Sequence, residues 1–189
     1  ILLDEEVQKE GAEIVKSVNQ EVAQLIGINA AARTTCVKPS GNASVLLQTA
    51  SGIHSEHSPQ YLRHVQLNKE SEITQAIIKS NPYMVEESVW SAGGTDVVVS
   101  FPILPNKGSI YKDDLIGVKH LELVKKAQKH WVDAGTNVDL CADKGVRHNV
   151  SNTILVDDWD EVEKYVFENR HSFAGISFLS MFGDKDFNQ

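Results

Sequence analysis

The chain contains little cysteine and comparatively little positive charge. Its two cysteines, Cys36 and Cys141, lie far apart and share no metal-type spacing, so we expect no disulfide framework but reduced thiols in a cytoplasmic setting. The 18 Lys and Arg residues are outnumbered by 26 Asp and Glu residues, which gives a net charge of −8. This balance argues against a nucleic-acid partner, because a nucleic-acid groove needs clustered basic side chains.

Long apolar runs and the common nucleotide motifs are also missing. No segment approaches the roughly 20 apolar residues of a membrane span, and no secretory leader is present, so no membrane partner is expected. The glycine spacings of the Walker loop and of the dinucleotide fingerprint do not occur. A nucleophile elbow is absent too, so an unrelated α/β hydrolase or transferase is a weak alternative. Because the chain starts at Ile1 and stops abruptly at Gln189, we expect a piece of a longer protein.

Apolar periodicity predicts alternating helices and strands. The helices are expected over 4–26, after the loop that precedes Val45, over 71–80, over 113–134 and after a cap at Asp157 or Asp158. The strands are expected over 33–38, 60–67, 95–101, 149–156 and 173–178. This alternation predicts an α/β fold with a largely parallel sheet or barrel. No repeat or domain break interrupts it, so residues 1–189 are taken as a single fragment.

The loop between the first strand and the following helix is the main candidate site. Hydroxyls, an amide, a glycine and free backbone N–H groups meet where parallel α/β folds place their chemistry, an arrangement that can hold a phosphate. The predicted contacts are Pro39, Ser40, Gly41, Asn42, Ala43 and Ser44. An ordinary turn, capped by Ser40 or Asn42, explains the pattern about equally well.

Three other groups of residues have weaker claims. His54, His57 and His64 lie close in sequence, but no third metal ligand accompanies the first two, so no metal site is predicted and a surface role is favoured over a ligand contact. Cys36 is expected to be a buried structural thiol rather than a nucleophile, because no base is evident beside it. Alternation places Asn149, Ser151 and Thr153 in one row, which either lines a site or, as we favour, faces solvent. No catalytic residue is assigned.

Several short motifs, in order along the chain, resemble one enzyme family. They are Val-Lys-Pro-Ser-Gly-Asn-Ala-Ser at 37–44, Ser-Gly-Ile-His at 51–54, Tyr-Leu-Arg at 61–63, Asn-Val-Ser-Asn-Thr-Ile at 149–154, Asp-Trp-Asp-Glu-Val at 158–162, Phe-Ala-Gly-Ile-Ser-Phe-Leu at 173–179 and Gly-Asp-Lys at 183–185. Each motif alone is modest, but the combination is specific. Together they resemble adenosylcobalamin-dependent (class II) ribonucleotide reductase.

The resemblance implies a fold, an activity and partners. The family fold is a ten-stranded α/β barrel made of two half-barrels, and this chain would form the second half. The family reduces the 2′-hydroxyl of ribonucleoside di- or triphosphates, using adenosylcobalamin to generate a thiyl radical that abstracts the ribose 3′-hydrogen. The implied partners are the nucleotide and the remaining N-terminal part of the barrel. The 39–44 loop resembles the segment that binds the substrate phosphates, although the family usually has Thr in place of Asn42.

Some features of the family have no counterpart in this chain. Neither Cys36 nor Cys141 fits the finger-loop motif, the partner redox cysteines or the C-terminal cysteine pair, so the isolated chain is expected to be inactive. Phe178 and Leu179 stand where iron-dependent reductases have a pair of tyrosines, which favours the cobalamin class. After Leu179 the usual proline is replaced by Ser180. The alternative function is a stand-alone phosphate- or nucleotide-binding α/β module without catalysis.

Overall fold

The computed structural model describes residues 4–182, which form two compact units. The smaller unit is His57–Gly108, and the larger unit comprises the residues before and after it. Gly183–Lys185, the last of the family-like motifs, lies outside the described residues. The assignment of 1–189 to a single fragment stays a prediction.

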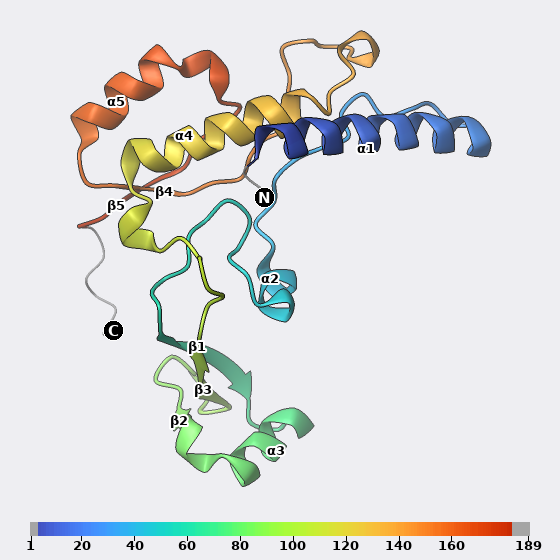
Figure 1. The fold of residues 1–189 in the computed structure, drawn as a ribbon. Helices are drawn as coiled ribbons and strands as arrows, with labels where there is room; N and C mark the ends of the chain where they lie inside the picture. Colours follow the sequence, from blue (N-terminus) through green and yellow to red (C-terminus); the bar gives the residue numbers. More distant parts are fainter. Residues whose placement is uncertain (1–3, 183–189) are drawn as a thin grey trace. The chain divides into compact units, whose positions relative to one another are not determined.

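The larger unit contains several helices and a two-stranded parallel sheet, which lies near α4 and α5 (Figure 1). Its α-helices are α1 (Glu5–Ile26), α2 (Gly41–Leu47), α4 (Gly117–Ala127), which continues into a π-helical turn (Gln128–Asp133), and α5 (Trp159–Glu168). Its strands are β4 (Ile154–Val156) and β5 (Phe178–Ser180). Short 3₁₀ turns occur at Lys112–Asp114, Val138–Leu140 and Arg170–Ser172.

The core of the larger unit lies where α4 packs against β4 and α5. Aliphatic side chains from these elements and from the segments beside them are removed from solvent, which is the main stabilising contribution to such a unit. The buried cluster consists of Leu121, Val124, Ala127, Val132, Val150, Ile154, Val156 and Val162. As expected, α5 begins at a capping aspartate: the Asp158 carboxylate accepts hydrogen bonds from the N–H groups of Asp160 and Glu161, both at 3.0 Å.

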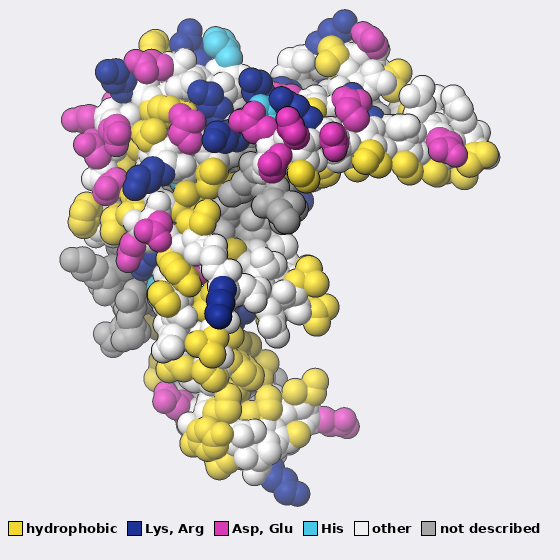
Figure 2. Space-filling model, viewed as in Figure 1, with side chains coloured by type: hydrophobic (Ala, Val, Ile, Leu, Met, Phe, Trp, Pro, Cys, Tyr) yellow, Lys and Arg dark blue, Asp and Glu magenta, His cyan; other side chains and the backbone are white. Residues whose placement is uncertain are grey.

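Helix α1 shows clear start and stop signals but an uncovered apolar face. The Asp4 carboxylate caps its first turn, and Gly27 ends it in the left-handed conformation at φ +72°. Its buried positions are Gln8, Ala12 and Ala23, on the side that contacts the π-helical turn. A second stripe of larger apolar side chains is solvent-exposed and visible along the helix in Figure 2. We call Val7, Ile14, Val15, Val18, Val22, Leu25 and Ile26 the α1 stripe.

The smaller unit is a three-stranded antiparallel sheet with one helix. It comprises β1 (Tyr61–Asn68), α3 (Glu72–Ser80), a 3₁₀ turn (Pro82–Met84), β2 (Val85–Glu87) and β3 (Asp96–Ile103), with the strand order β1-β3-β2. Val97 and Val99 are its buried centre. The expectation of a largely parallel sheet is wrong here, because β2 and β3 form a hairpin and β1 pairs antiparallel along the whole of β3.

Two predicted elements, a helix and a strand, are shorter or less regular than expected. The helix over 113–134 begins only at Gly117, which has φ +53° after an extended Ile116, and it ends as a π-helical turn. Segment 33–38 is extended but not a continuous strand, because Arg33 bridges Thr136 antiparallel whereas Val37 bridges Val150 in parallel. A ladder that changes partner and direction cannot be regular.

The predicted strands over 149–156 and 173–178 are also corrected. The two segments form a parallel ladder only between β4, at the end of the first predicted strand, and β5, which begins at the last residue of the second. Upstream of β4 the side chain of Asn152 takes the place of a backbone ladder: its Nδ2 donates to the Gly175 carbonyl at 3.0 Å, and its Oδ1 accepts from the Ser177 N–H at 3.2 Å. Within the described residues no helix is both long and apolar enough to span a membrane.

Candidate functional site

The 39–44 loop joins the extended segment before it to the short helix α2. Ser40 occupies the N-cap position with φ −91° and ψ 2°, and Gly41 follows in the left-handed region at φ +36°. The backbone of Gly41 therefore adopts a conformation that side chains disfavour, while its Cβ position faces open space. Most of the loop is accessible to solvent, namely Pro39, Gly41, Asn42 and Ala43.

Two reciprocal hydrogen bonds hold this loop against the segment around Ser51. The Ser40 N–H donates to the Ser51 hydroxyl at 3.1 Å, and the Gly52 N–H donates to the Ser40 hydroxyl at 3.2 Å. We call this pair of bonds the serine clasp. Gly52 has φ +61°, and a Cβ there would lie 2.6 Å from the Lys38 carbonyl oxygen, so glycine is required for the two segments to approach.

The clasp shows that Ser40 does not act as the side-chain cap of α2. Because the Ser40 hydroxyl accepts from Gly52, it does not cap α2, which has no side-chain cap bond. The N–H groups of Gly41 and Asn42 have no acceptor among the described residues. The loop therefore presents two adjacent backbone donors, those of Gly41 and Asn42, to solvent.

The other predicted contacts have internal partners. The Ala43 N–H donates to the Ser40 carbonyl at 2.8 Å, and the Ser44 hydroxyl donates to the Gly41 carbonyl at 2.7 Å from a buried position. These bonds shape the loop from within. Their effect is to leave Gly41 and Asn42 as its most available donors, with the exposed Lys38 as the nearest cation in sequence.

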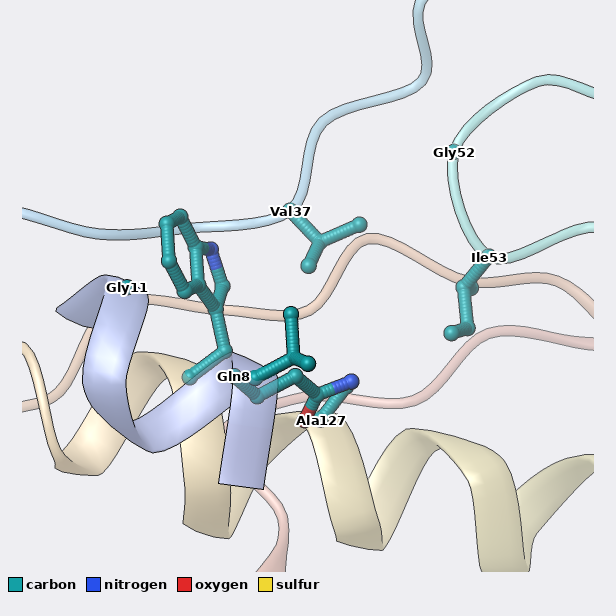
Figure 3. A pocket seen from close by; sticks show the side chains of 8 residues that line it. Gln8, Gly11, Val37, Gly52, Ile53 and Ala127 are labelled. Atoms are coloured by element: carbon teal, nitrogen blue, oxygen red, sulfur yellow. The ribbon is translucent and has the colours of Figure 1, made fainter. Parts of the chain in front are cut away.

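An apolar cavity of about 360 Å³ adjoins the clasp through Gly52. Figure 3 shows Val37 and Ile53 on two loops above Gln8 of α1 and Ala127 of α4. Gly11 and the Trp131 ring complete one wall; a Cβ on Gly11 would come within 3.3 Å of that ring. Apart from Gln8 the lining is apolar, so the cavity suits a hydrocarbon group and not a phosphate.

The histidines do not assemble a metal site. His54 belongs to the larger unit, where its Nδ1 lies 2.8 Å from the Ser51 carbonyl. His57 and His64 belong to the smaller unit, where His57 stacks edge-on with Tyr61 and His64 bonds the Ser100 hydroxyl at 2.8 Å. Among residues 4–182 no group of three His, Cys, Asp or Glu side chains is placed to hold a metal ion.

The prediction that Cys36 is buried is wrong. Cys36 is exposed, whereas Cys141 is buried. Thr35 is only 3% exposed and donates to the Trp131 carbonyl at 2.6 Å. Since neighbouring side chains of an extended segment point in opposite directions, the burial of Thr35 turns Cys36 outward.

The polar row over 149–153 faces solvent, as favoured. Asn149 and Thr153 are exposed and Ser151 is half-buried. Asn152, on the opposite side, is buried and donates from Nδ2 to the Val150 carbonyl at 2.7 Å as well as to Gly175. Its role is to join two segments of the core.

Sequence reasoning missed the residues that contact the loop, and those that contact the 51–54 turn beside it. The sequence marks Ser51 and Gly52 only as part of a motif. The glycine is the one local signal that this segment and the 39–44 loop approach each other closely. His120 on α4 was missed altogether. It is 3% exposed, and its Nε2 lies 3.1 Å from the Ile53 carbonyl. Burial lowers the pKa of His120 from 6.5 to about 4, so its ring is neutral at physiological pH.

The class of protein that these features define is an α/β protein, and comparison with known proteins specifies it further. No family profile matches the chain. A probable adenosylcobalamin-dependent ribonucleoside-triphosphate reductase from Dictyostelium discoideum is 28% identical over 123 residues, which are 65% of this chain and 16% of that protein. An adenosylcobalamin-dependent ribonucleoside-triphosphate reductase from Euglena gracilis is 23% identical over 184 residues, which are 96% of this chain and 23% of that protein.

A solved structure agrees with these relatives. The crystal structure of a B12-dependent (class II) ribonucleotide reductase matches with a TM-score of 0.71 and 19% identity, covering 94% of this chain and 24% of that one. The likeness shows that nearly the whole chain has the fold of part of that enzyme. The resemblance to adenosylcobalamin-dependent ribonucleotide reductases is thereby confirmed. The chain spans 16% and 23% of the lengths of the curated relatives it matches.

Proposed function

We propose that this chain is the C-terminal half of the catalytic barrel of an adenosylcobalamin-dependent ribonucleotide reductase, and that its 39–44 loop holds the substrate phosphates. The observation that carries the proposal is the match of 96% of the chain to one such reductase and of 94% to the fold of another. The reaction of the complete enzyme is the reduction of a ribonucleotide to a 2′-deoxyribonucleotide. Because both curated relatives are named triphosphate reductases, a ribonucleoside triphosphate is the preferred substrate.

The geometry of the loop supports a role in phosphate binding. A phosphate oxygen accepts hydrogen bonds, and the N–H groups of Gly41 and Asn42 have no acceptor in the described part of the chain. The Asn42 side-chain amide adds a donor at the same place, and Lys38 adds a positive charge to a chain whose net charge is −8. The clasp to Ser51 and Gly52 keeps these donors in place before the nucleotide arrives, which reduces the entropy lost on binding.

The radical chemistry belongs to other parts of the complete enzyme. Adenosylcobalamin would supply the initiating radical there. The apolar cavity beside Gly52, with Gln8 as its single polar lining side chain, does not fit a corrin with amide substituents around its rim. We therefore assign no residue of this chain to the cofactor. In the same way, Cys36 and Cys141 carry no catalytic role, and the chain contributes substrate binding.

The α1 stripe supports a partner within the same enzyme. A soluble helix rarely leaves a continuous row of large aliphatic side chains in water unless another surface covers it. Ile14, Leu25 and Ile26 are each more than 60% exposed. We propose that the remaining N-terminal part of the barrel covers this stripe, because the solved relative is about four times as long as the segment matched here.

The substrate-phosphate role is tested in the complete enzyme with Ser40→Ala and Gly41→Val. Ser40→Ala removes one of the two clasp bonds and Gly41→Val forces a branched side chain into a left-handed conformation, so each is expected to raise the Michaelis constant for the nucleotide at least fivefold. Ser80→Ala removes an exposed hydroxyl at the end of α3, and Gly94→Val tests the same strain at φ +62° in the smaller unit.

The two control variants should leave the Michaelis constant unchanged. Unchanged constants for Ser40→Ala and Gly41→Val as well would refute the loop assignment. A different pair of results would favour a stand-alone binding module over a reductase. These are tight nucleotide binding by the isolated chain and no reductase activity in the product of the complete gene.

A further inference from the structure

His120 is a buried polar side chain that neither the predicted site nor the proposed chemistry uses. It sits on α4 with 3% of its surface exposed, and its Nε2 lies 3.1 Å from the Ile53 carbonyl oxygen. Because a carbonyl oxygen can only accept, Nε2 carries the hydrogen and donates it. A helix of the core thus holds the backbone of an irregular segment 67 positions earlier in the chain.

The segment that His120 holds is a tight turn over 51–54. The His54 N–H donates to the Ser51 carbonyl at 3.1 Å, and His54 Nδ1 donates to the same oxygen at 2.8 Å. The His54 ring also meets the His120 ring edge-on, with centroids 5.9 Å apart and an interplanar angle of 80°. The two rings and the Ile53 carbonyl therefore fix the end of this turn against α4.

The beginning of the same turn carries the serine clasp. Ser51 accepts from the Ser40 N–H, and Gly52 donates to the Ser40 hydroxyl. Only one peptide unit separates the Gly52 N–H from the Ile53 carbonyl that His120 binds. A shift of the Ile53 carbonyl consequently moves both halves of the clasp, and with them the Gly41 and Asn42 donors that follow Ser40.

We propose that His120 is a positioning residue for the 39–44 loop: its hydrogen bond to Ile53 sets the 51–54 turn, and the turn sets Ser40. The inference rests on the proposed function for the nature of the ligand, a nucleoside triphosphate, but not for the link between His120 and the loop. The ring acts as a neutral donor, because burial lowers its pKa to about 4. His120 therefore contributes geometry to the loop and no charge to the phosphate.

The test compares His120→Gln with His120→Met. The two side chains have nearly the same length and shape, but only glutamine can donate to the Ile53 carbonyl. In the 189-residue chain, amide exchange measured by NMR at Ser40 and Gly52 reports the clasp without any nucleotide. We expect exchange at both amides to be about fivefold faster in His120→Met, as loss of one hydrogen bond implies, and nearly unchanged in His120→Gln. Equal exchange in the wild-type chain and His120→Met would overturn the inference.

Kinetics of the complete reductase supply the second readout. His120→Met should raise the Michaelis constant for the nucleotide about fivefold with the turnover number within twofold, and His120→Gln should restore the Michaelis constant. A fall in turnover with an unchanged Michaelis constant would overturn the positioning role. Faster clasp exchange together with an unchanged Michaelis constant would leave the link from His120 to the loop standing and would refute the phosphate role. If His120→Met does not fold, His120→Asn, whose amide is too short to reach, takes its place under the same criteria.

Discussion

The backbone N–H of Ser40 donates to the hydroxyl of Ser51 at 3.1 Å, and the neighbouring Gly52 N–H returns a bond to the Ser40 hydroxyl at 3.2 Å. This reciprocal arrangement diverts Ser40 from capping α2 and leaves the donors of Gly41 and Asn42 open. Two segments eleven residues apart therefore behave as one structural unit.

Gly52→Ala is expected to destabilise the protein by about 2–4 kcal/mol. An added Cβ would lie 2.6 Å from the Lys38 carbonyl oxygen, a backbone atom, in a residue with φ +61°. Both the contact and the left-handed conformation are unfavourable for alanine. Gly94→Ala is the matched control, since Gly94 has φ +62° with open space around its Cβ. Urea denaturation measures the free energy of unfolding of both variants. Equal losses of stability would show that the contact of the added Cβ with Lys38 is relieved at no cost.

Asn152→Ala is expected to lower the free energy of unfolding by about 2–3 kcal/mol. The substitution leaves the partly buried Gly175 carbonyl and Ser177 N–H without the partners that the Asn152 amide supplies, and it removes a buried bond to the Val150 carbonyl, so polar groups lose their partners at a cost in stability. Asn149→Ala, at an exposed position three residues earlier, should change stability by less than about 0.5 kcal/mol. A stability loss no larger than that of Asn149→Ala would show that water replaces the amide.

Stability is expected to fall as the pH drops from 6.5 to 4 because of His120. Burial lowers the pKa of His120 from 6.5 to about 4, so between these values the unfolded chain binds a proton that the folded chain does not. Unfolding therefore takes up a proton in this window, and acidification favours the unfolded state. The contribution of the neutral His120 ring to the free energy of unfolding is complete above pH 6.5 and is lost by pH 4. It amounts to up to about 3 kcal/mol.

The measurement for His120 is denaturant unfolding at a series of pH values. His120→Gln removes the titrating ring but keeps a donor for the Ile53 carbonyl, so its stability should depend less steeply on pH than that of the wild-type chain. Carboxylates titrate in both proteins and cancel in the comparison. Parallel curves for the two proteins between pH 4 and 6.5 would contradict the prediction.

Val18→Lys is expected to weaken assembly of the complete barrel without destabilising this chain. Val18 is 51% exposed on the α1 stripe, so a lysine there is tolerated in water but costly under a covering apolar surface. We expect at least tenfold weaker association with the remaining part of the barrel, measured by sedimentation of the two coexpressed parts. Glu10→Lys introduces the same side chain at an exposed α1 position outside the stripe and should leave association unchanged. Equal association of both variants would argue against the stripe as the interface.

Local signals predicted the ends of α1 and the start of α5 well, but they predicted the start of α4 and the sheet partners poorly. Asp4, Gly27 and Asp158 mark helix boundaries through interactions with backbone groups a few residues away, so their roles can be inferred from sequence. The direction of β1 against β3 depends on how the whole 57–108 unit folds, and no short pattern encodes it. The exposure of Cys36 likewise follows from the burial of Thr35 against Trp131, a contact between residues nearly 100 positions apart.

The candidate site likewise has features that the sequence predicted and features that only the tertiary structure decided. Residue types alone made the 39–44 loop the candidate, because a glycine, hydroxyls and an amide at the end of an extended segment suit an anion-binding turn, as they also suit an ordinary turn. The family resemblance added its expected ligand. Tertiary structure alone decided that the Ser40 hydroxyl binds Gly52 instead of capping α2, and that His120 supports the turn from behind. Hydrogen bonds between distant segments arise only when packing brings their donors and acceptors within about 3 Å, and the linear order of residues does not contain that distance.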